Sequence, residues 1–130
     1  MNDLILVTEA DMSLLSLLRT HAPLRRELDR AIVVSSAVVP PDVATMNSKI
    51  RYIDETAGEQ RTVSLVYPEQ ADGSGKKISV LAPVGTALLG LSEGLAIDWD
   101  FPDGSRRRLK LLQVVHQPER VNNSPLPRAP

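Results

Sequence analysis

The side chains best able to do chemistry in this chain are two histidines and a few serines. His21 and His116 could ligate a metal or accept a proton, but neither lies in a recognisable metal-ligand pattern and the chain has no cysteine. Ser13, Ser16 and the Ser35-Ser36 pair would act as nucleophiles only beside a general base, and no histidine is paired with them in a recognisable arrangement. We therefore expect no catalytic residue, no metal site and no cofactor.

Two basic stretches could contact phosphate groups. Residues 73–77 read GSGKK, but they lack the GxxxxGK[ST] spacing of a phosphate loop and precede a strand, which is typical of a hairpin turn. The run from Arg106 to Lys110 lies opposite Asp98 and Asp100 in a predicted hairpin, which indicates a self-neutralised, solvated face. Because 15 Lys+Arg and 16 Asp+Glu give a net charge of -1, we expect no direct sequence-specific contact with nucleic acid.

The overall composition favours a small protein of the cytoplasm. A chain of 130 residues usually forms one domain, or one domain with an appendage. It has no cysteine for disulfides, no basic leader at its start, and no apolar run near the roughly 20 residues that span a bilayer. We expect a soluble, cytoplasmic monomer without a membrane segment.

The spacing of apolar residues within residues 1–40 predicts two short amphipathic helices that form an antiparallel hairpin. Thr8 and Glu9 are suited to cap a helix that runs from Asp11 to about Arg19. A second helix is predicted from Pro23 through Ile32, because apolar residues recur there at helical spacing. Pro40 and Pro41 end the region. The predicted tip of the hairpin consists of Arg19, Thr20, His21, Ala22 and Pro23.

Beyond Pro41 the apolar period changes from helical to strand-like. Gly58 and residues 72–75 supply turns between short β-rich runs. Pro83–Leu91 predicts a short helix, with proline early and Gly90 near its end. The strands predicted in this part are residues 50–53, 62–67 and 78–81.

The last strand pair has the most specific local signal. Phe101–Ser105 reads FPDGS, the pattern of a type I turn closed by a left-handed glycine. This turn sets the register, so Asp98 and Asp100 should oppose Arg108 and Arg106 on one face, with Ile97 opposite Leu109 on the other. The tail, residues 118–130, holds four prolines and little apolar material, so we expect it to be disordered.

Residues 79–104 resemble the C-terminal module of the bacterial transcript-cleavage factors, the Gre family. The shared features are a strand that runs into Ala82-Pro83, a helix at Ala87-Leu88, and a turn containing Pro102 and Gly104, with Gly90 and Gly94 between them. Residues 42–51 are similar to the family's junction between helical arm and globular module. The segments TMNSKIRY, VSLVYPEQ and VLAPVGTALLGL are most similar to one branch, the regulators of nucleoside diphosphate kinase, whose helical hairpin is short.

The resemblance implies an α+β fold in two parts. A short N-terminal antiparallel helical hairpin, of coiled-coil type, would occupy residues 1–40. An antiparallel β-sheet domain of FKBP-like topology, with one short helix, would occupy residues 41–117. The family implies RNA polymerase as the protein partner, with this domain at the rim of the secondary channel and the hairpin directed into it. The residues that match the family's docking loop are Leu81, Ala82, Pro83 and Val84.

This chain departs from the cleavage factors in ways that bear on function. Those factors carry acidic residues at the hairpin tip that help hold a magnesium ion, which carboxylate oxygens suit. The tip here has no carboxylate. The nearby carboxylates of Glu27 or Asp29 can form ion pairs with Arg30 or Arg25. Leu81 is also apolar where cleavage factors tend to be acidic. We therefore expect a non-enzymatic regulator of transcription that binds polymerase without stimulating transcript cleavage.

Two alternatives belong to other classes of function. The chain could be a protein-binding regulator of nucleoside diphosphate kinase, or of related nucleotide metabolism, without polymerase binding. FKBP-like topology also raises prolyl isomerisation, but such a pocket needs several aromatic walls, and the chain has one Trp, one Phe and two Tyr. Trp99 and Phe101 lie beside a turn, where packing beneath the sheet explains them. The sequence thus favours the polymerase-binding regulator.

Overall fold

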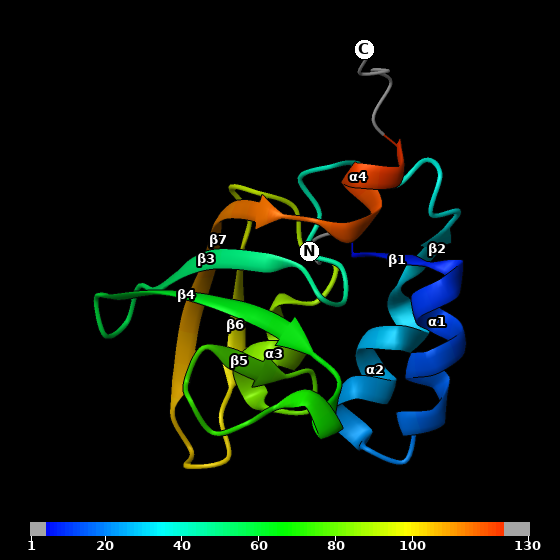
Figure 1. The fold of residues 1–130 in the computed structure, drawn as a ribbon. Coiled ribbons are helices and arrows are strands. Elements are labelled where there is room, and N and C mark those ends of the chain that lie inside the picture. The colour runs from blue at the N-terminus through cyan, green and yellow to red at the C-terminus, as the bar shows by residue number, and fades with distance from the viewer. Residues whose placement is uncertain (1–4, 124–130) are drawn as a thin grey trace.

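The computed structural model describes residues 5–123, with side chains for residues 5–120. A curled sheet lies on one side of the molecule (Figure 1). Residues 6–34, called the helical segment, lie on the other side. The N-terminal elements are β1 (Leu6–Thr8), α1 (Glu9–Leu15), the 3-10 turn η1 (Ser16–Leu18), α2 (Ala22–Arg30) and β2 (Ile32–Val34). They are followed by β3 (Lys49–Asp54), β4 (Glu59–Val66), η2 (Pro68–Gln70), β5 (Lys77–Ser79), α3 (Pro83–Leu88), β6 (Ala96–Asp100), β7 (Arg106–His116) and α4 (Pro118–Asn123).

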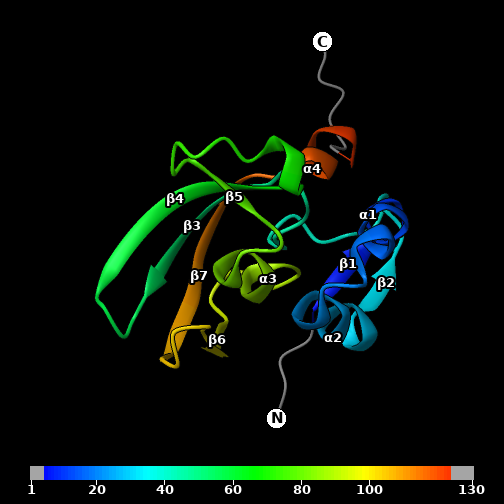
Figure 2. The ribbon, with the colours of Figure 1, turned by 90° about the horizontal axis from the view of Figure 1, so that it is seen from below.

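The main sheet has five strands in the order β5-β4-β3-β7-β6 and curls around α3 (Figure 2). The α+β class is therefore confirmed. All pairs are antiparallel except β4 and β5, which run parallel with Ser64 opposite Lys77. The prediction that residues 72–75 form a hairpin turn is wrong. The chain between Tyr67 and Lys76 passes through η2 and returns alongside β4 before β5 begins, so the connection is a crossover.

The predicted register of the last hairpin is confirmed. Ile97 pairs with Leu109, Asp98 with Arg108, and Asp100 with Arg106. The Phe101 N–H donates to the Ser105 carbonyl at 2.8 Å, and Gly104 has a φ of 86°, in the left-handed region that the turn requires. Because this turn is local in sequence, its residues alone determine which side chains face the core.

The N-terminal segment has both predicted helices, but they are shorter than expected. Thr8 caps α1 by accepting a hydrogen bond from the Asp11 N–H at 3.1 Å. Helix α2 ends at Arg30, so the prediction that helix extends to Ile32 is wrong, and Ile32 begins β2, which pairs in parallel with β1. Helices of 7 and 9 residues are too short for the several heptads of a coiled coil, and that part of the prediction is not confirmed. The FKBP-like description stays a prediction.

Two hydrophobic clusters form the core. The first core cluster lies inside the curl of the sheet and joins α3 to Ile50, Tyr52, Val63, Leu109 and Leu111. The second core cluster joins Leu15, Leu24 and Leu28 of the helical segment to Met46, Leu65, Val80 and Leu89. Burying these leucines against the sheet holds the helical segment on the sheet, since each buried side chain stabilises the packed state by about 2 kcal/mol. The division into domains at residue 40 stays a prediction.

The C-terminal end of the described chain is anchored to the junction after the helical segment. Gln117 is fully buried, and its amide donates to the carbonyls of Pro40 and Val43 at 2.8 and 2.9 Å. The Glu119 carboxylate accepts a hydrogen bond from Thr45 at 2.7 Å. The prediction of disorder from Pro118 is therefore wrong for α4, because these long-range contacts order it. Residues 124–130 of the predicted tail lie outside the described residues.

Within residues 5–123, no helix is both long enough and apolar enough to cross a bilayer.

Candidate functional site

The loop between β5 and α3 is held in one shape by its own hydrogen bonds. The Ser79 hydroxyl accepts from the Leu81 N–H at 3.0 Å, and the Ser79 carbonyl accepts from the Ala82 N–H at 3.0 Å. The buried Thr86 hydroxyl donates back to the Val80 carbonyl at 2.6 Å. Residues 79–82 thus form a tight turn that presents Leu81 on the surface side of the loop.

Gly85 allows α3 to lie directly against this loop. A Cβ atom at Gly85 would lie 2.1 Å from the Ser79 carbonyl oxygen and 3.1 Å from the Val80 Cα. Both are backbone atoms, which cannot turn aside as a flexible side chain can. The glycine in this helix, unfavourable on propensity alone, is therefore explained by close packing between helix and loop.

A cavity of about 290 Å³ lies where this loop meets the helical segment and the β6 end. Leu81 and Pro83 of the loop line this cavity, and so do His21 and Pro23 of the helical segment. The aromatic part of the lining comes from strand β6 and its turn. Together these lining residues are His21, Pro23, Leu81, Pro83, Trp99 and Phe101. This cavity, the loop–tip pocket, thus brings together residues of the predicted docking loop and residues of the predicted hairpin tip.

The remaining predicted docking residues have structural positions beside the pocket. Ala82 is the N-cap residue of α3, and Val84 packs against the first core cluster. Leu81 and Pro83 are half-buried, so both keep surface that a partner can cover. Trp99 and Phe101 do pack against the first core cluster, as predicted, but the sequence analysis missed that they also line the pocket. The sequence did contain a signal for this role: two of the four aromatic residues of the chain lie together at the end of one predicted strand.

The predicted tip lies around the turn between η1 and α2. His21 is the N-cap residue of α2, and its Nδ1 atom is buried without a hydrogen-bond partner among the described residues. Arg19 forms an ion pair with Asp29, whereas the sequence suggested Arg25 for that carboxylate. Glu27 pairs with Arg30 at 2.8 Å, as suggested. Both acids of α2 are therefore engaged by arginines. Thr20 lies in the turn, and Ala22 is the first residue of α2.

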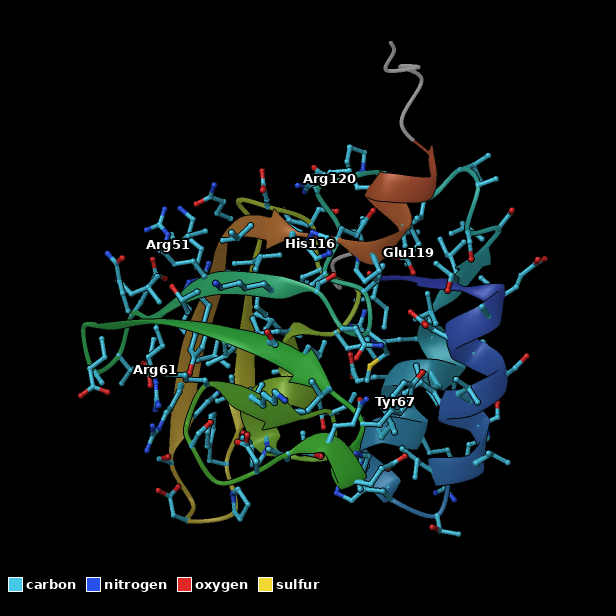
Figure 3. The ribbon with its side chains drawn as sticks, viewed as in Figure 1. Arg51, Arg61, Tyr67, His116, Glu119 and Arg120 are labelled. Atoms are coloured by element: carbon cyan, nitrogen blue, oxygen red, sulfur yellow. The ribbon has the colours of Figure 1, made fainter. Side chains whose placement is uncertain are left out.

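A second group of polar side chains lies where α1, the 45–48 turn and α4 meet. Asp11 accepts a hydrogen bond from the Met46 N–H at 3.1 Å. Nearby, Glu119 accepts a hydrogen bond from the Thr45 hydroxyl. Burial, with a smaller contribution from Glu119, raises the pKa of Asp11 to about 6, although the Met46 hydrogen bond opposes the shift. Burial also raises the pKa of Tyr67, whose hydroxyl has no hydrogen-bond partner among the described residues. Figure 3 shows Tyr67 on the side of the sheet that faces the helices.

Comparison with known proteins identifies the family. The family model described as the C-terminal part of the transcription elongation factors GreA and GreB matches residues 39–116, more than half of the chain. The chain belongs to the GreA/GreB family. The matched region includes the loop before α3 and the β6–β7 hairpin, so the resemblance drawn from those residues is confirmed.

Individual members of the GreA/GreB family resemble this chain to different extents. A regulator of nucleoside diphosphate kinase from Escherichia coli is 45% identical over 96 residues, which cover 74% of this chain and 71% of that protein. A GreA elongation factor from Clostridium botulinum is 36% identical over 81 residues, but these cover only 51% of that protein. A solved GreA/GreB structure from Nitrosomonas europaea superposes with a TM-score of 0.69 at 40% identity, covering 88% of this chain and all of that one.

The names of these GreA/GreB-family relatives are those of regulators and elongation factors. The prediction that the chain is a regulatory protein, not an enzyme, is therefore confirmed. The likeness to the regulator of nucleoside diphosphate kinase was predicted from three segments, and it is confirmed as well. The solved relative also confirms the mixed fold with a curled sheet.

The raised pKa of Asp11 predicts an unusual pH dependence of stability. The folded state binds a proton at Asp11 more tightly than the unfolded chain, so the free energy of unfolding contributed by this group falls as the pH rises from 3.8 to about 6. Asp11→Asn should therefore stabilise the protein above that range by about 1–2 kcal/mol and have little effect below it. Urea unfolding of both proteins across this range measures the difference.

Asp72→Asn provides the matched control, because hydrogen bonds from Ser74 lower the pKa of that exposed carboxyl. The stability contributed by Asp72 is present at higher pH and is lost as the pH falls. Asp72→Asn should therefore be less stable than the wild type at higher pH, and this difference should shrink as the pH falls. A difference between Asp11→Asn and the wild type that stays constant with pH contradicts the prediction.

Proposed function

We propose that this chain is a non-enzymatic regulator that binds RNA polymerase near the secondary channel and modulates transcription without transcript cleavage. In this proposal residues 41–117 dock on the polymerase, and residues 1–40 form the part directed toward the channel. The protein would act as a monomer in the cytoplasm, with polymerase as its protein partner. The observation that carries the proposal is the loop–tip pocket in a chain of the GreA/GreB family.

The chemistry of the pocket suits a protein partner. Most of its lining is leucine, proline and aromatic carbon, and Asp100 adds one carboxylate. Leu81, Pro83 and Trp99 are half-buried, so a partner's apolar side chain would complete their burial. Such an anchor in a dry pocket is the usual source of affinity in a protein interface. Because His21 and Pro23 line the same pocket as Leu81, a partner seated on the docking loop would also touch the helical segment.

The absence of cleavage activity is supported by the carboxylates around the tip. The turn from Arg19 to Pro23 contains no acid, and Asp29 is paired with Arg19. A magnesium ion needs several oxygen ligands that converge on it, and a carboxylate already held by a guanidinium is a poor ligand. Among the described residues, no group of three or more His, Cys, Asp and Glu side chains is arranged to hold a metal. The helical segment would therefore act by occupying space.

The alternative is a protein-binding regulator of nucleoside diphosphate kinase without polymerase binding. The specific observation in its favour is the name of the relative that is 45% identical over 96 residues. The same loop–tip pocket would then receive a segment of that enzyme. The two proposals differ in the partner and share the docking surface.

One experiment tests the first proposal against the second. Purified RNA polymerase stalled on a backtracked RNA is mixed with the protein, and both co-elution and shortening of the RNA are measured. We expect the protein to co-elute with polymerase and the RNA to keep its length, with a GreA factor as the positive control for cleavage. Shortened RNA contradicts the non-cleaving role. A parallel run replaces polymerase with purified nucleoside diphosphate kinase. Co-elution with this kinase but not with polymerase supports the alternative.

A further inference from the structure

The outer face of the sheet, turned away from α3, carries an uneven distribution of charge. Strand pairing brings Lys77 of β5, Ser64 of β4, Lys49 of β3 and His116 of β7 into one row across the sheet. Neighbouring strands lie about 4.8 Å apart, so Lys77 and Lys49 are separated by about 10 Å. Ammonium groups on flexible stems of that spacing can converge on one ligand.

The two ends of this face differ in how their cations are paired. Near β6, Arg106 pairs with Asp100 at 2.7 Å and Arg108 pairs with Asp98 at 3.3 Å. Near β5, by contrast, Lys49, Lys76 and Lys77 take part in none of the ion pairs of the described residues. Hydrogen bonds from Ser74 lower the pKa of the Asp72 carboxyl, and Lys77 is close enough to help lower it, but Lys77 and Asp72 form no ion pair. The exposed lysines of the β5 end are therefore available to an anionic ligand.

These lysines surround a hollow of about 430 Å³ at the β5 end. Its lining residues include the three lysines together with Thr62 and Ser64. The Ser64 N–H donates to the Lys76 carbonyl at 2.8 Å, which holds the loop against β4 and keeps the lysines beside the hydroxyls. Arg61, visible on β4 in Figure 3, donates to the Gly75 carbonyl of the same loop.

We propose that this hollow, called the lysine hollow, binds a chain of phosphate groups. Three positive charges and two hydroxyl donors match the several negative oxygens of an oligophosphate, and charge-assisted hydrogen bonds are the stronger kind. None of the lining residues is aromatic, so a nucleobase finds no stacking surface there and the phosphates carry the recognition.

The lysine hollow differs from a phosphate loop in its construction. In a phosphate loop, backbone N–H groups at a helix N-terminus hold the anion. Here the donors are side chains from three adjacent strands and one loop, so the register of β3, β4 and β5 assembles them. The hollow shares no residue with the loop–tip pocket, so phosphate binding and polymerase docking can be tested separately.

The test uses the full chain and titration calorimetry at low salt, with sodium tripolyphosphate as the first ligand. We expect saturable binding that weakens as salt is raised. The double variant Lys49→Gln, Lys77→Gln should weaken binding at least about tenfold, because two charge-assisted contacts are lost. Lys77→Gln alone should weaken binding about threefold or more. Lys110→Gln is the control matched to this single variant, because it also removes one charge: the lysine lies on the same outer face, opposite Ile53, but outside the hollow. It should weaken binding less than about twofold, as expected for long-range charge alone.

Further arms of the experiment distinguish the source of the phosphates. ATP should bind and adenosine should not, since the hollow recognises the phosphate chain. A short DNA duplex tests the nucleic-acid backbone. If it binds and Lys110→Gln weakens it as much as Lys77→Gln does, the whole face and not the hollow is the site, and the proposal is overturned. Absence of saturable tripolyphosphate binding, or equal losses in Lys77→Gln and Lys110→Gln, also overturns it.

Discussion

Replacing both Leu81 and Pro83 by glutamate is expected to reduce binding to RNA polymerase at least about a hundredfold. A partner that covers the loop–tip pocket would have to bury two like charges in a lining that already contains Asp100, which costs several kcal/mol. Surface plasmon resonance with immobilised core polymerase measures the change in Kd.

Leu81 packs partly against the second core cluster, so its replacement could also weaken the fold. Pro23→Glu removes this ambiguity, because it introduces a charge into the same pocket from a different element, helix α2. Pro23 is in the first turn of α2, where an acidic side chain interacts favourably with the helix dipole. The variant should fold normally, and its affinity for polymerase should still fall about tenfold or more.

Val38→Glu is the matched control for these variants, since Val38 is 68% exposed and lies outside the pocket lining. It should bind polymerase like the wild type. If the pocket variants and Val38→Glu all bind normally, the loop–tip pocket is not the docking surface. If the wild type binds nucleoside diphosphate kinase instead and the pocket variants lose that binding, the surface is right and the partner is the alternative one.

Gly85→Ala is expected to destabilise the protein by on the order of 3 kcal/mol, although alanine normally stabilises a helix relative to glycine. The new Cβ would lie 2.1 Å from the Ser79 carbonyl oxygen and 3.0 Å from the Ser79 carbonyl carbon. To relieve the overlap, α3 must move away from the loop, which opens the core around Ala87 and Leu88. Urea unfolding followed by circular dichroism gives the free energy difference.

Gly58→Ala is the control for this substitution. Gly58 has a φ of 74°, and no atom lies within 4 Å of its added Cβ, so only the strain of the left-handed backbone is expected, about 1 kcal/mol. An unfolding curve for Gly85→Ala that matches the wild type would show that the loop moves freely. The same variant should also lose polymerase binding, because α3 and the docking loop shift together.

Several parts of the fold were predictable because their causes are close together in the sequence. The turn at Phe101–Ser105 set the register of β6 and β7, and every predicted pair was found. The alternation of apolar residues likewise identified β3 and β4, and Pro83 with Gly90 bounded the region of α3. The absence of an acid at the tip is also a property of the sequence alone.

Other features depended on contacts between residues far apart in the chain. The parallel pairing of β5 with β4 needs the crossover through η2, and local turn residues at 72–75 gave no sign of it. Ile32 fits a helical pattern, but pairing with Leu6 in β1 draws it into a strand. The residues that follow Gln117 form α4 because Gln117 and Glu119 find hydrogen-bond partners in the junction after the helical segment.

The sequence by itself determined the family, the α+β class, the final hairpin and a tip without carboxylates, because short motifs and periodic patterns encode these features locally. Only the tertiary structure decided that His21 and Leu81 line one pocket and that Lys49, Lys76 and Lys77 line one hollow. These arrangements follow from strand register and from the packing of α2 against the sheet. The free energy of burying apolar side chains depends on which distant surfaces meet, so a local pattern does not specify it.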